Sequence, residues 1–326
     1  NSAIWLIVGA FLFSRVFIKT GLGKRIAYNL IAAFGSSSLR LSYALALSDL
    51  ILAPATPSNT ARVGGVIMPI TTSLAKAFGS EPQDGPRKIG SFLMQSIYQV
   101  NTITSAMFQT SMAGNTLVAA LALQSFGIGI TWGDWAMAAI VPGIIALIIM
   151  PYFIYKVYPP EIKDARGAQQ MIREELKGLG KMSFQEWVML GVFVLALVLW
   201  ATSQFTKIDA TTVAFLGISI LLATGVLIWD DVKSEKGAWD TLVWMGTLMG
   251  FAGFLSKLGF IKWATVLVGG YIPEGSWIIA FVIAVLINTY SHYVFASLTA
   301  HISAMFVAFS AIAISAGAPP MLTLLM

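Results

Sequence analysis

Small hydroxyl and amide side chains interrupt two long apolar stretches of the chain at matching positions. The first stretch, residues 41–79, contains Ser58, Asn59 and Thr60 directly after a proline, and the second, residues 276–317, contains Ser297 and Thr299. Proline removes a donor and cannot continue a helix comfortably, so we expect a new helix to begin at each interruption. The free N–H groups and partial positive charge of a helix start suit a carboxylate. Two such tips that face each other predict a site for the two ends of a short dicarboxylate.

An ionisable residue lies two positions after the threonine of each tip. Arg62 follows Thr60, and His301 follows Thr299. A charged side chain inside a membrane is costly and points to a pathway or a partner charge, and histidine takes either form near neutral pH. We interpret the two residues as fixed cations. The alternative is that Arg62 pairs with Asp49 on the opposite arm of its stretch, while His301 is a packed neutral ring.

A third apolar stretch, residues 90–124, is too long and too polar for a plain membrane crossing. We expect a break near residues 110–115 that lines the site, with Thr110, Ser111, Gly114 and Asn115 as candidate residues. The alternatives are ordinary polar packing between helices for these residues and simple helix capping for the serines and threonines of the tips.

The composition indicates that lipid is the solvent. Hydrophobic residues make up 57% of the 326 positions and charged residues 11%, against about 25% in soluble domains. The net charge of +5 lies mainly in short loops, which is typical of a membrane protein and argues against nucleic acid. The sequence begins and stops inside apolar runs, so we expect a fragment. The remaining predicted spans are 3–19, 134–157, 184–203, 209–229 and 240–258, with a last helix starting near Pro320.

Two short motifs recur about 239 positions apart. Lys19–Lys24 (KTGLGK) matches Lys257–Lys262 (KLGFIK), and Pro57–Arg62 (PSNTAR) matches Ala296–His301 (ASLTAH). If each interrupted stretch enters and leaves on one side, fourteen Lys and Arg residues fall in the loops of one side and three in the loops of the other. Basic loops stay in the cytoplasm. The sequence therefore predicts an all-α polytopic membrane protein with inverted repeats and two re-entrant hairpins, which is the architecture of secondary transporters.

These elements predict four segments. Residues 1–30 form a scaffold-side span and the start of a surface helix, and residues 31–130 contain the first hairpin and the broken helix. Residues 131–265 supply scaffold spans with an amphipathic linker at 159–182, and residues 266–326 contain the second hairpin and the start of the last helix.

The sequence lacks the residues that several other kinds of chemistry require. The chain has no cysteine and only two histidines, with no H-E-x-x-H motif and no phosphate-binding glycine loop. We therefore predict no metal site, no cofactor and no enzymatic activity. An anion channel and an intramembrane enzyme remain as alternatives from other classes.

The S-N-T tip, the second S-x-T and the K-T-G before the first hairpin resemble the divalent anion/sodium symporter (DASS) family. Ala53–Ile70 is similar to its citrate/succinate and 2-oxoglutarate/malate exchanger branch. The resemblance implies a homodimer with an elevator-type fold, in which a transport domain moves against a scaffold. It also implies that Ser58, Asn59, Thr60, Ser297 and Thr299 contact a small dicarboxylate.

The sequence departs from the sodium-coupled members of that family at the tips. Leu298 replaces asparagine in the second tip, and Arg62 and His301 stand where those members have small neutral residues. Leucine cannot coordinate a cation, and the two ionisable residues could supply the positive charge that sodium brings. We predict a sodium-independent antiporter for small dicarboxylates, with a sodium-coupled symporter as the alternative. We place it in a bacterial plasma membrane or, alternatively, a plastid inner envelope.

Overall fold

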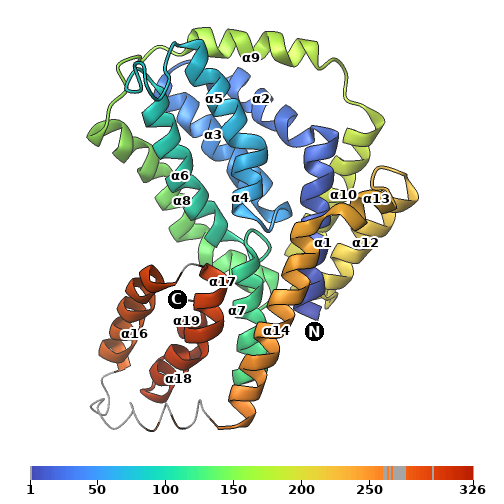
Figure 1. The fold of residues 1–326 in the computed structure, drawn as a ribbon, viewed down its shortest axis with the longest axis vertical. Coiled ribbons are helices and arrows are strands. Elements are labelled where there is room, and N and C mark those ends of the chain that lie inside the picture. Colours follow the sequence, from blue (N-terminus) through green and yellow to red (C-terminus); the bar gives the residue numbers. More distant parts are fainter. Residues whose placement is uncertain (1, 260–262, 264–265, 267–276, 296, 326) are drawn as a thin grey trace.

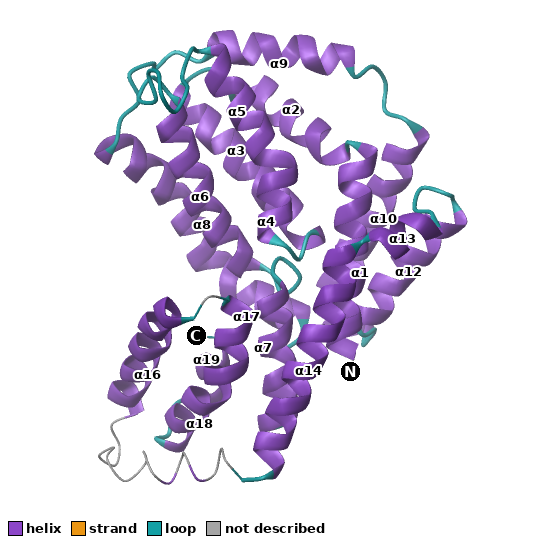
Figure 2. Ribbon diagram, in the orientation of Figure 1, coloured by secondary structure: helices purple, strands orange, loops and turns teal. Residues whose placement is uncertain are grey.

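The computed structural model describes residues 2–259, 263, 266, 277–295 and 297–325, and the regular elements of this part are all helices. Within these described residues, five segments are long and apolar enough to cross a membrane: Ser2–Thr20, Trp132–Val157, Phe184–Ala201, Trp277–Val294 and Leu298–Ser315. Figures 1 and 2 show these helices in two groups that meet near the middle of the molecule. The predicted all-α polytopic membrane fold is confirmed.

The first hairpin is an antiparallel helix pair whose tip points toward the middle of the molecule (Figure 1). After α1 (Ser2–Thr20) and the short α2 (Leu22–Phe34), the chain passes through five consecutive elements. These are α3 (Ser38–Leu52), the 3-10 turn η1 (Ala53–Ala55), α4 (Asn59–Arg62), the π-helical turn η2 (Val63–Ile67) and α5 (Met68–Ala77). Pro54 and Pro57 explain why the helix stops and restarts there, because neither residue can donate a backbone hydrogen bond.

The second hairpin repeats the same order of elements. It consists of α16 (Trp277–Ser291), η3 (His292–Val294), α17 (Leu298–His301), η4 (Ile302–Phe306) and α18 (Val307–Ser315). The 3-10 turn, the short helix and the π-helical turn each begin 239 positions after their counterparts. The motif match between the two tips therefore extends to the backbone. Ala296 and part of the predicted match at Lys257–Lys262 lie outside the described residues.

The stretch 90–124 is two helices, α6 (Gly90–Met107) and α7 (Ala113–Phe126). Residues 108–112 between them form turns and bends, so the predicted break is present and begins two residues earlier than expected. Helix α6 packs against α3 and against α8 (Trp132–Val157), while α7 packs against α1, η4 and α17. The broken helix thus reaches from the first hairpin to the second.

The remaining helices of the described part complete the fold. They are the surface helix α9 (Arg166–Gly178), α10 (Phe184–Ala201), α11 (Ser203–Thr206), α12 (Ala210–Ala223), α13 (Trp229–Ser234), α14 (Lys236–Lys257) and the start of the last helix, α19 (Pro320–Leu324). Among them, α10, α12, α13 and α14 pack on α1. The span predicted at 209–229 is shorter than expected, because Gly225 adopts a left-handed conformation directly after α12. Helix α9 lies across one end of the molecule, where Gln169 donates to the Ala32 carbonyl at 2.8 Å.

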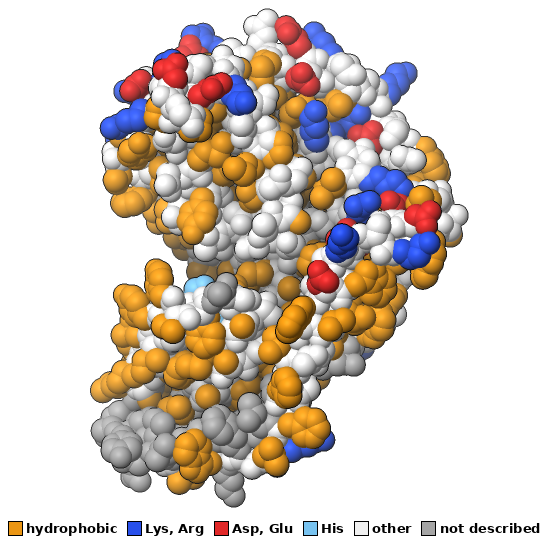
Figure 3. All heavy atoms as spheres, in the orientation of Figure 1, with side chains coloured by type: hydrophobic (Ala, Val, Ile, Leu, Met, Phe, Trp, Pro, Cys, Tyr) orange, Lys and Arg blue, Asp and Glu red, His pale blue; other side chains and the backbone are white. Residues whose placement is uncertain are grey.

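Helix α1 forms much of the core and packs against α10, α12 and α14. Phe13 and Phe17 are each 1% exposed, and their rings contact Trp200 and Phe193 of α10. Figure 3 shows charged side chains gathered over the α9 end and near α13, with hydrophobic side chains over the rest of this face. This division fits a body that sits in lipid with its charged loops in water.

The contact between α1 and α12 depends on Gly217. A Cβ atom there would overlap the ring of Phe13 and lie 3.1 Å from Cγ1 of Val192. We expect Gly217→Val to lower stability by about 1–3 kcal/mol, because a packed interior has no room for the added carbons. Thermal unfolding of the full-length protein in detergent measures this effect. Gly191→Val is the control, since Gly191 has nothing within 4 Å of the same position; equal melting temperatures for the two variants would contradict the prediction.

Candidate anion-binding site

The tip of the first hairpin presents the start of a helix together with its polar side chains. Ser58 Oγ accepts from the Ala61 amide at 3.1 Å, and Asn59 Oδ1 accepts from the Thr60 amide at 2.8 Å. The Thr60 side chain is exposed, whereas Ser58 and Asn59 are partly buried. From Asn59 the helix continues through the π-helical turn to Ala77, so its partial positive end lies at the tip.

The tip of the second hairpin has the same construction. Ser297 Oγ accepts from the Ala300 amide at 3.5 Å, as Ser58 does three residues before Ala61. Ser297 is exposed and Thr299 is partly buried. The capping alternative therefore describes the hydrogen bonds that both serines make here. Capping uses the serine oxygen as an acceptor, which leaves the hydroxyl hydrogen free to donate to a bound anion.

Both hairpins touch the start of α7. The Ala113 amide donates to the Pro57 carbonyl at 2.8 Å, which fixes the first tip. A Cβ atom on Gly114 would lie 2.8 Å from Cδ1 of Ile302 and 4.0 Å from Cδ2 of Leu298, so the second hairpin packs directly on this glycine. Contacts to two adjacent residues of α7 therefore bring the two hairpins together at the break.

The polar residues of the break serve mainly to satisfy backbone groups. Thr110 donates to the Pro54 carbonyl at 2.6 Å, Ser111 donates to the Ser105 carbonyl at 2.6 Å, and Asn115 donates to the same carbonyl at 2.7 Å. All three side chains are 5% exposed or less. The polar-packing alternative accounts for their hydrogen bonds in this structure, and Gly114 provides the close approach just described.

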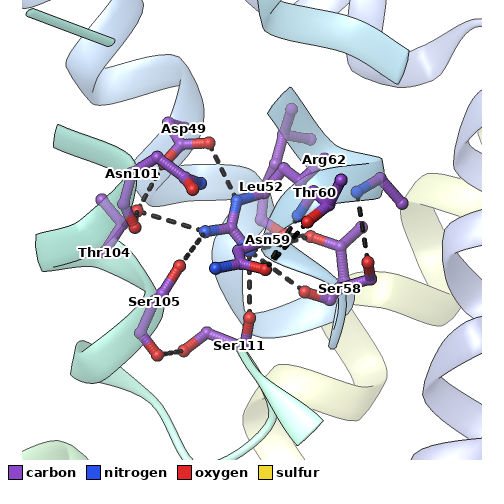
Figure 4. A network of polar contacts seen from close by, with 12 residues as sticks. Asp49, Leu52, Ser58, Asn59, Thr60, Arg62, Asn101, Thr104, Ser105 and Ser111 are labelled. Atoms are coloured by element: carbon purple, nitrogen blue, oxygen red, sulfur yellow. Dashed lines mark hydrogen bonds and ion pairs between the residues drawn. The ribbon is translucent and has the colours of Figure 1, made fainter. Parts of the chain in front are cut away.

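Arg62 is the polar centre of the first hairpin (Figure 4). Its side chain is 0% exposed, and Nε lies 2.8 Å from Oδ1 of Asp49 on α3. Its other nitrogens donate to four further groups at 3.0–3.2 Å: the carbonyls of Thr56 and Ser111 and the hydroxyls of Thr104 and Ser105. One side chain thus joins both arms of the hairpin, its tip, α6 and the break.

The pairing alternative for Arg62 is therefore the arrangement observed. Asp49 offsets the charge of the guanidinium, and Thr104 and Asn101 also donate to the carboxylate. The nest around the guanidinium consists of two carbonyls, hydroxyls and one carboxylate. Oxygen ligands of these kinds bind hard metal cations. A guanidinium that is tethered to the chain thus occupies a nest lined by oxygen atoms.

His301 occupies the equivalent position in the second hairpin and is 3% exposed. Its Nε2 lies 2.9 Å from the Ser291 hydroxyl, and its ring contacts those of His292 and Phe295 at centroid distances of 5.3 and 5.0 Å. At the offset of 239, the position of Asp49 corresponds to Asn288. The second hairpin therefore has an amide and an imidazole where the first has a carboxylate and a guanidinium.

A cavity of about 560 Å³ lies beside the first tip. Ser58, Thr60 and Ala61 line one side, and residues of α1, α13 and the start of α14 line the other. Arg15 and Lys19 belong to this wall and were not among the predicted site residues. An arginine inside the apolar run 3–19 was the signal that could have identified the first of them.

Comparison with known proteins places the chain in a family. The model of the sodium:sulfate symporter transmembrane region matches residues 1–326. The chain belongs to the divalent anion/sodium symporter family. The family assignment made from the S-N-T tip is therefore confirmed, while the roles of the individual tip residues stay predictions.

Three relatives in this symporter family illustrate the similarity. The chain is 53% identical over 326 residues to the putative malate transporter YflS of Bacillus subtilis, covering 100% of this chain and 68% of that protein. It is 47% identical over 323 residues to dicarboxylate transporter 1, chloroplastic, of Spinacia oleracea, covering 98% of this chain and 56% of that protein. It is 45% identical over 326 residues to the inner membrane protein YbhI of Escherichia coli, covering 100% of this chain and 68% of that protein. The chain thus spans between 56% and 68% of the length of these symporter-family relatives.

The second hairpin suggests a test of the Asp49–Arg62 pair. We expect Asp49→Asn to lower stability by about 3–5 kcal/mol, because it leaves the guanidinium buried without its partner charge. Adding Arg62→His should recover part of this loss, because an imidazole, unlike a guanidinium, can give up its proton when its partner charge is absent. Melting temperatures of the single and double variants measure both effects. A double variant that is less stable than Asp49→Asn would contradict the charge-pair explanation.

Proposed function

We propose that this membrane protein exchanges small dicarboxylates such as malate, 2-oxoglutarate or succinate across a membrane without sodium. The names of two relatives support the substrate class, since one is a putative malate transporter and another a dicarboxylate transporter. The identity of 45–53% extends over nearly the whole chain. The two tips, which meet at the start of α7, have the polarity that two carboxylates require.

The observation that carries the proposal is the oxygen-lined nest filled by Arg62. A sodium-coupled carrier must fill and empty its cation position in every cycle, because the ion gradient drives the transport. A guanidinium attached to the chain stays in place, so this hairpin keeps the same charge throughout the cycle. The side chain of Leu298 in the second tip offers no oxygen ligand either. Both features favour transport that depends on the dicarboxylates alone.

We assign substrate contact to Ser58, Asn59 and Thr60 at one tip and to Ser297 and Thr299 at the other. Amide and hydroxyl donors at a helix start form charge-assisted hydrogen bonds with a carboxylate, and these are stronger than neutral ones. His301 lies under the second tip as a residue that can add positive charge when protonated. Arg62 supports the first tip by donating a hydrogen bond to the backbone carbonyl of Thr56.

An empty carrier has to move these same donors through a low-dielectric barrier without a partner. Burying one unpaired polar group costs about 1–3 kcal/mol by mutational measures, and each tip has several. A bound dicarboxylate pairs the donors and removes this cost. Movement in each direction therefore needs cargo, which makes the carrier an exchanger.

We further propose an elevator movement in a homodimer. The hairpins and the broken helix form the moving unit, and α1, α8, α10, α12 and α14 form the scaffold. Helices α2 and α9 lie between the two groups as connecting arms, and Gln169 and Arg173 of α9 hold the end of α2 through the Ala32 carbonyl. The repeated order of elements supports the inverted-repeat architecture of secondary transporters. A bacterial plasma membrane is the proposed location.

Exchange makes a direct prediction for reconstituted full-length protein. Vesicles loaded with unlabelled malate should take up labelled malate, whereas empty vesicles should take up little, because the empty carrier does not return. Replacing external sodium by choline should leave the loaded rate unchanged. Sodium-driven accumulation of malate in empty vesicles would contradict the exchanger and favour the symporter.

The tip assignment predicts a loss of substrate affinity in Thr60→Val. We expect the KM for malate to rise about tenfold or more, because a hydrogen bond to a charged group contributes about 1.5–3 kcal/mol. Thr102→Val on the exposed face of α6 is the control, since its hydroxyl bonds only to the Tyr98 carbonyl in the described part of the chain. An unchanged KM in Thr60→Val would remove this residue from the site.

A further inference from the structure

The cavity beside the first tip contains a guanidinium that has few partners. The Arg15 side chain is 40% exposed and lies 3.6 Å from Oδ1 of Asp231 on α13, which is an ion pair without a hydrogen bond. Within the described part of the chain, the structure shows no hydrogen bond donated by the guanidinium of Arg15. Arginine has five N–H donors in a planar fork that matches a carboxylate. These donors are available in a cavity that Ser58 and Thr60 also line.

The neighbouring cation is bound differently. Lys19 donates to Oδ2 of Asp231 at 2.5 Å and to the Val226 carbonyl at 3.1 Å, so its ammonium is already occupied. Asp231 is also held by the Ile228 amide at 3.2 Å. Burial raises the pKa of Asp231, but the hydrogen bond from Lys19 and the other contacts outweigh this effect and leave the pKa lowered. Lys19 and Asp231 therefore compensate each other, while the donors of Arg15 remain free.

Glu235 is the second acidic residue that lines this cavity. Burial raises its pKa, and the positive charge of Arg15 opposes part of this rise. Arg15 thus shares this cavity with two acidic residues, and its ion pair is with Asp231, which Lys19 also binds. An arriving carboxylate would meet Arg15 beside both acidic side chains.

We propose that Arg15 binds one carboxylate of the dicarboxylate while the other rests on the first hairpin tip. This inference rests on the proposed function and adds a substrate ligand from the scaffold. Ser58 and Thr60 belong to the proposed moving unit, whereas Arg15 belongs to α1. The three residues share one cavity in this conformation, and movement of the hairpin to the opposite face separates them. Arg15 therefore contributes to affinity on only one face of the membrane.

The loops next to Arg15 indicate on which face of the membrane it contributes to affinity. Arg15 lies near the end of α1 that leads into residues 19–40, and Asp231 and Glu235 lie in residues 230–238. Both loops belong to the side that carries most of the basic residues and that we predict to be cytoplasmic. Figure 3 shows charged side chains of both signs gathered near α13. The affinity contributed by Arg15 should therefore appear on the cytoplasmic side.

The test measures malate exchange by full-length protein reconstituted in one orientation, with malate varied on one face and saturating on the other. Arg15→Gln should raise the KM about tenfold on the cytoplasmic face, since a charge-assisted bidentate contact is lost, and leave the KM on the opposite face unchanged. Glu235→Gln should lower the cytoplasmic KM, because it removes one negative charge from the lining of the cavity that an anionic substrate enters. Arg40→Gln is the matched control, since Arg40 is exposed and its guanidinium donates to the Ser36 hydroxyl at 3.2 Å.

The two variants are expected to change the KM in opposite directions, and this distinguishes an effect on binding from a disturbed fold. A disturbed fold raises KM or lowers rates in both variants, whereas the proposal requires one KM to rise and the other to fall on the same face. Equal cytoplasmic KM values for Arg15→Gln and Arg40→Gln, or equal changes on both faces, would overturn the role of Arg15. Absence of malate exchange by the wild-type protein would instead overturn the proposed function itself.

Discussion

The site depends on how a broken helix satisfies its backbone inside the membrane. Lipid supplies no hydrogen bonds, so irregular backbone persists there only if protein groups pair with it. At the first hairpin the carbonyls of Pro54, Thr56 and Pro57 accept from Thr110, Arg62 and Ala113, respectively. Thr110 and Ala113 belong to the break and the start of α7, and Arg62 belongs to the hairpin and also donates to the Ser111 carbonyl of the break. The contacts that satisfy the tip therefore also attach it to the break between α6 and α7.

Arg62 is the strongest of these connections because it combines charge with geometry. Its planar fork reaches five groups on four segments, and Asp49 offsets the cost of an unpaired buried charge. The second hairpin repeats the same backbone with Asn288 and His301 in place of this pair. The two hairpins thus solve one structural problem with different chemistry, and only the first has a permanent cation at this position. This difference supports the proposed independence of substrate binding from sodium.

Much of this arrangement could be predicted from residue types and spacing. The S-N-T and S-x-T tips, the break near Thr110 and the surface helix near residue 170 follow from prolines, small polar residues and charge within apolar runs. The state of Arg62 could not be decided in advance, because a cation that faces a ligand and one that is paired have the same sequence pattern. Arg15 was not predicted as a site residue for a related reason. Its importance depends on α13 and the first tip, which lie far from it in the sequence and meet it only in the folded chain.

The central claim is that Arg62 permanently fills the position of a coupling cation. The most direct test is to measure malate binding to the purified full-length protein by calorimetry, at constant ionic strength, with sodium replaced stepwise by choline. A ligand whose site includes sodium binds more tightly as sodium rises, because the two binding equilibria are linked. Our account predicts the same Kd at every sodium concentration. A Kd that falls as sodium increases would show that a sodium site persists beside the guanidinium, and would contradict the account.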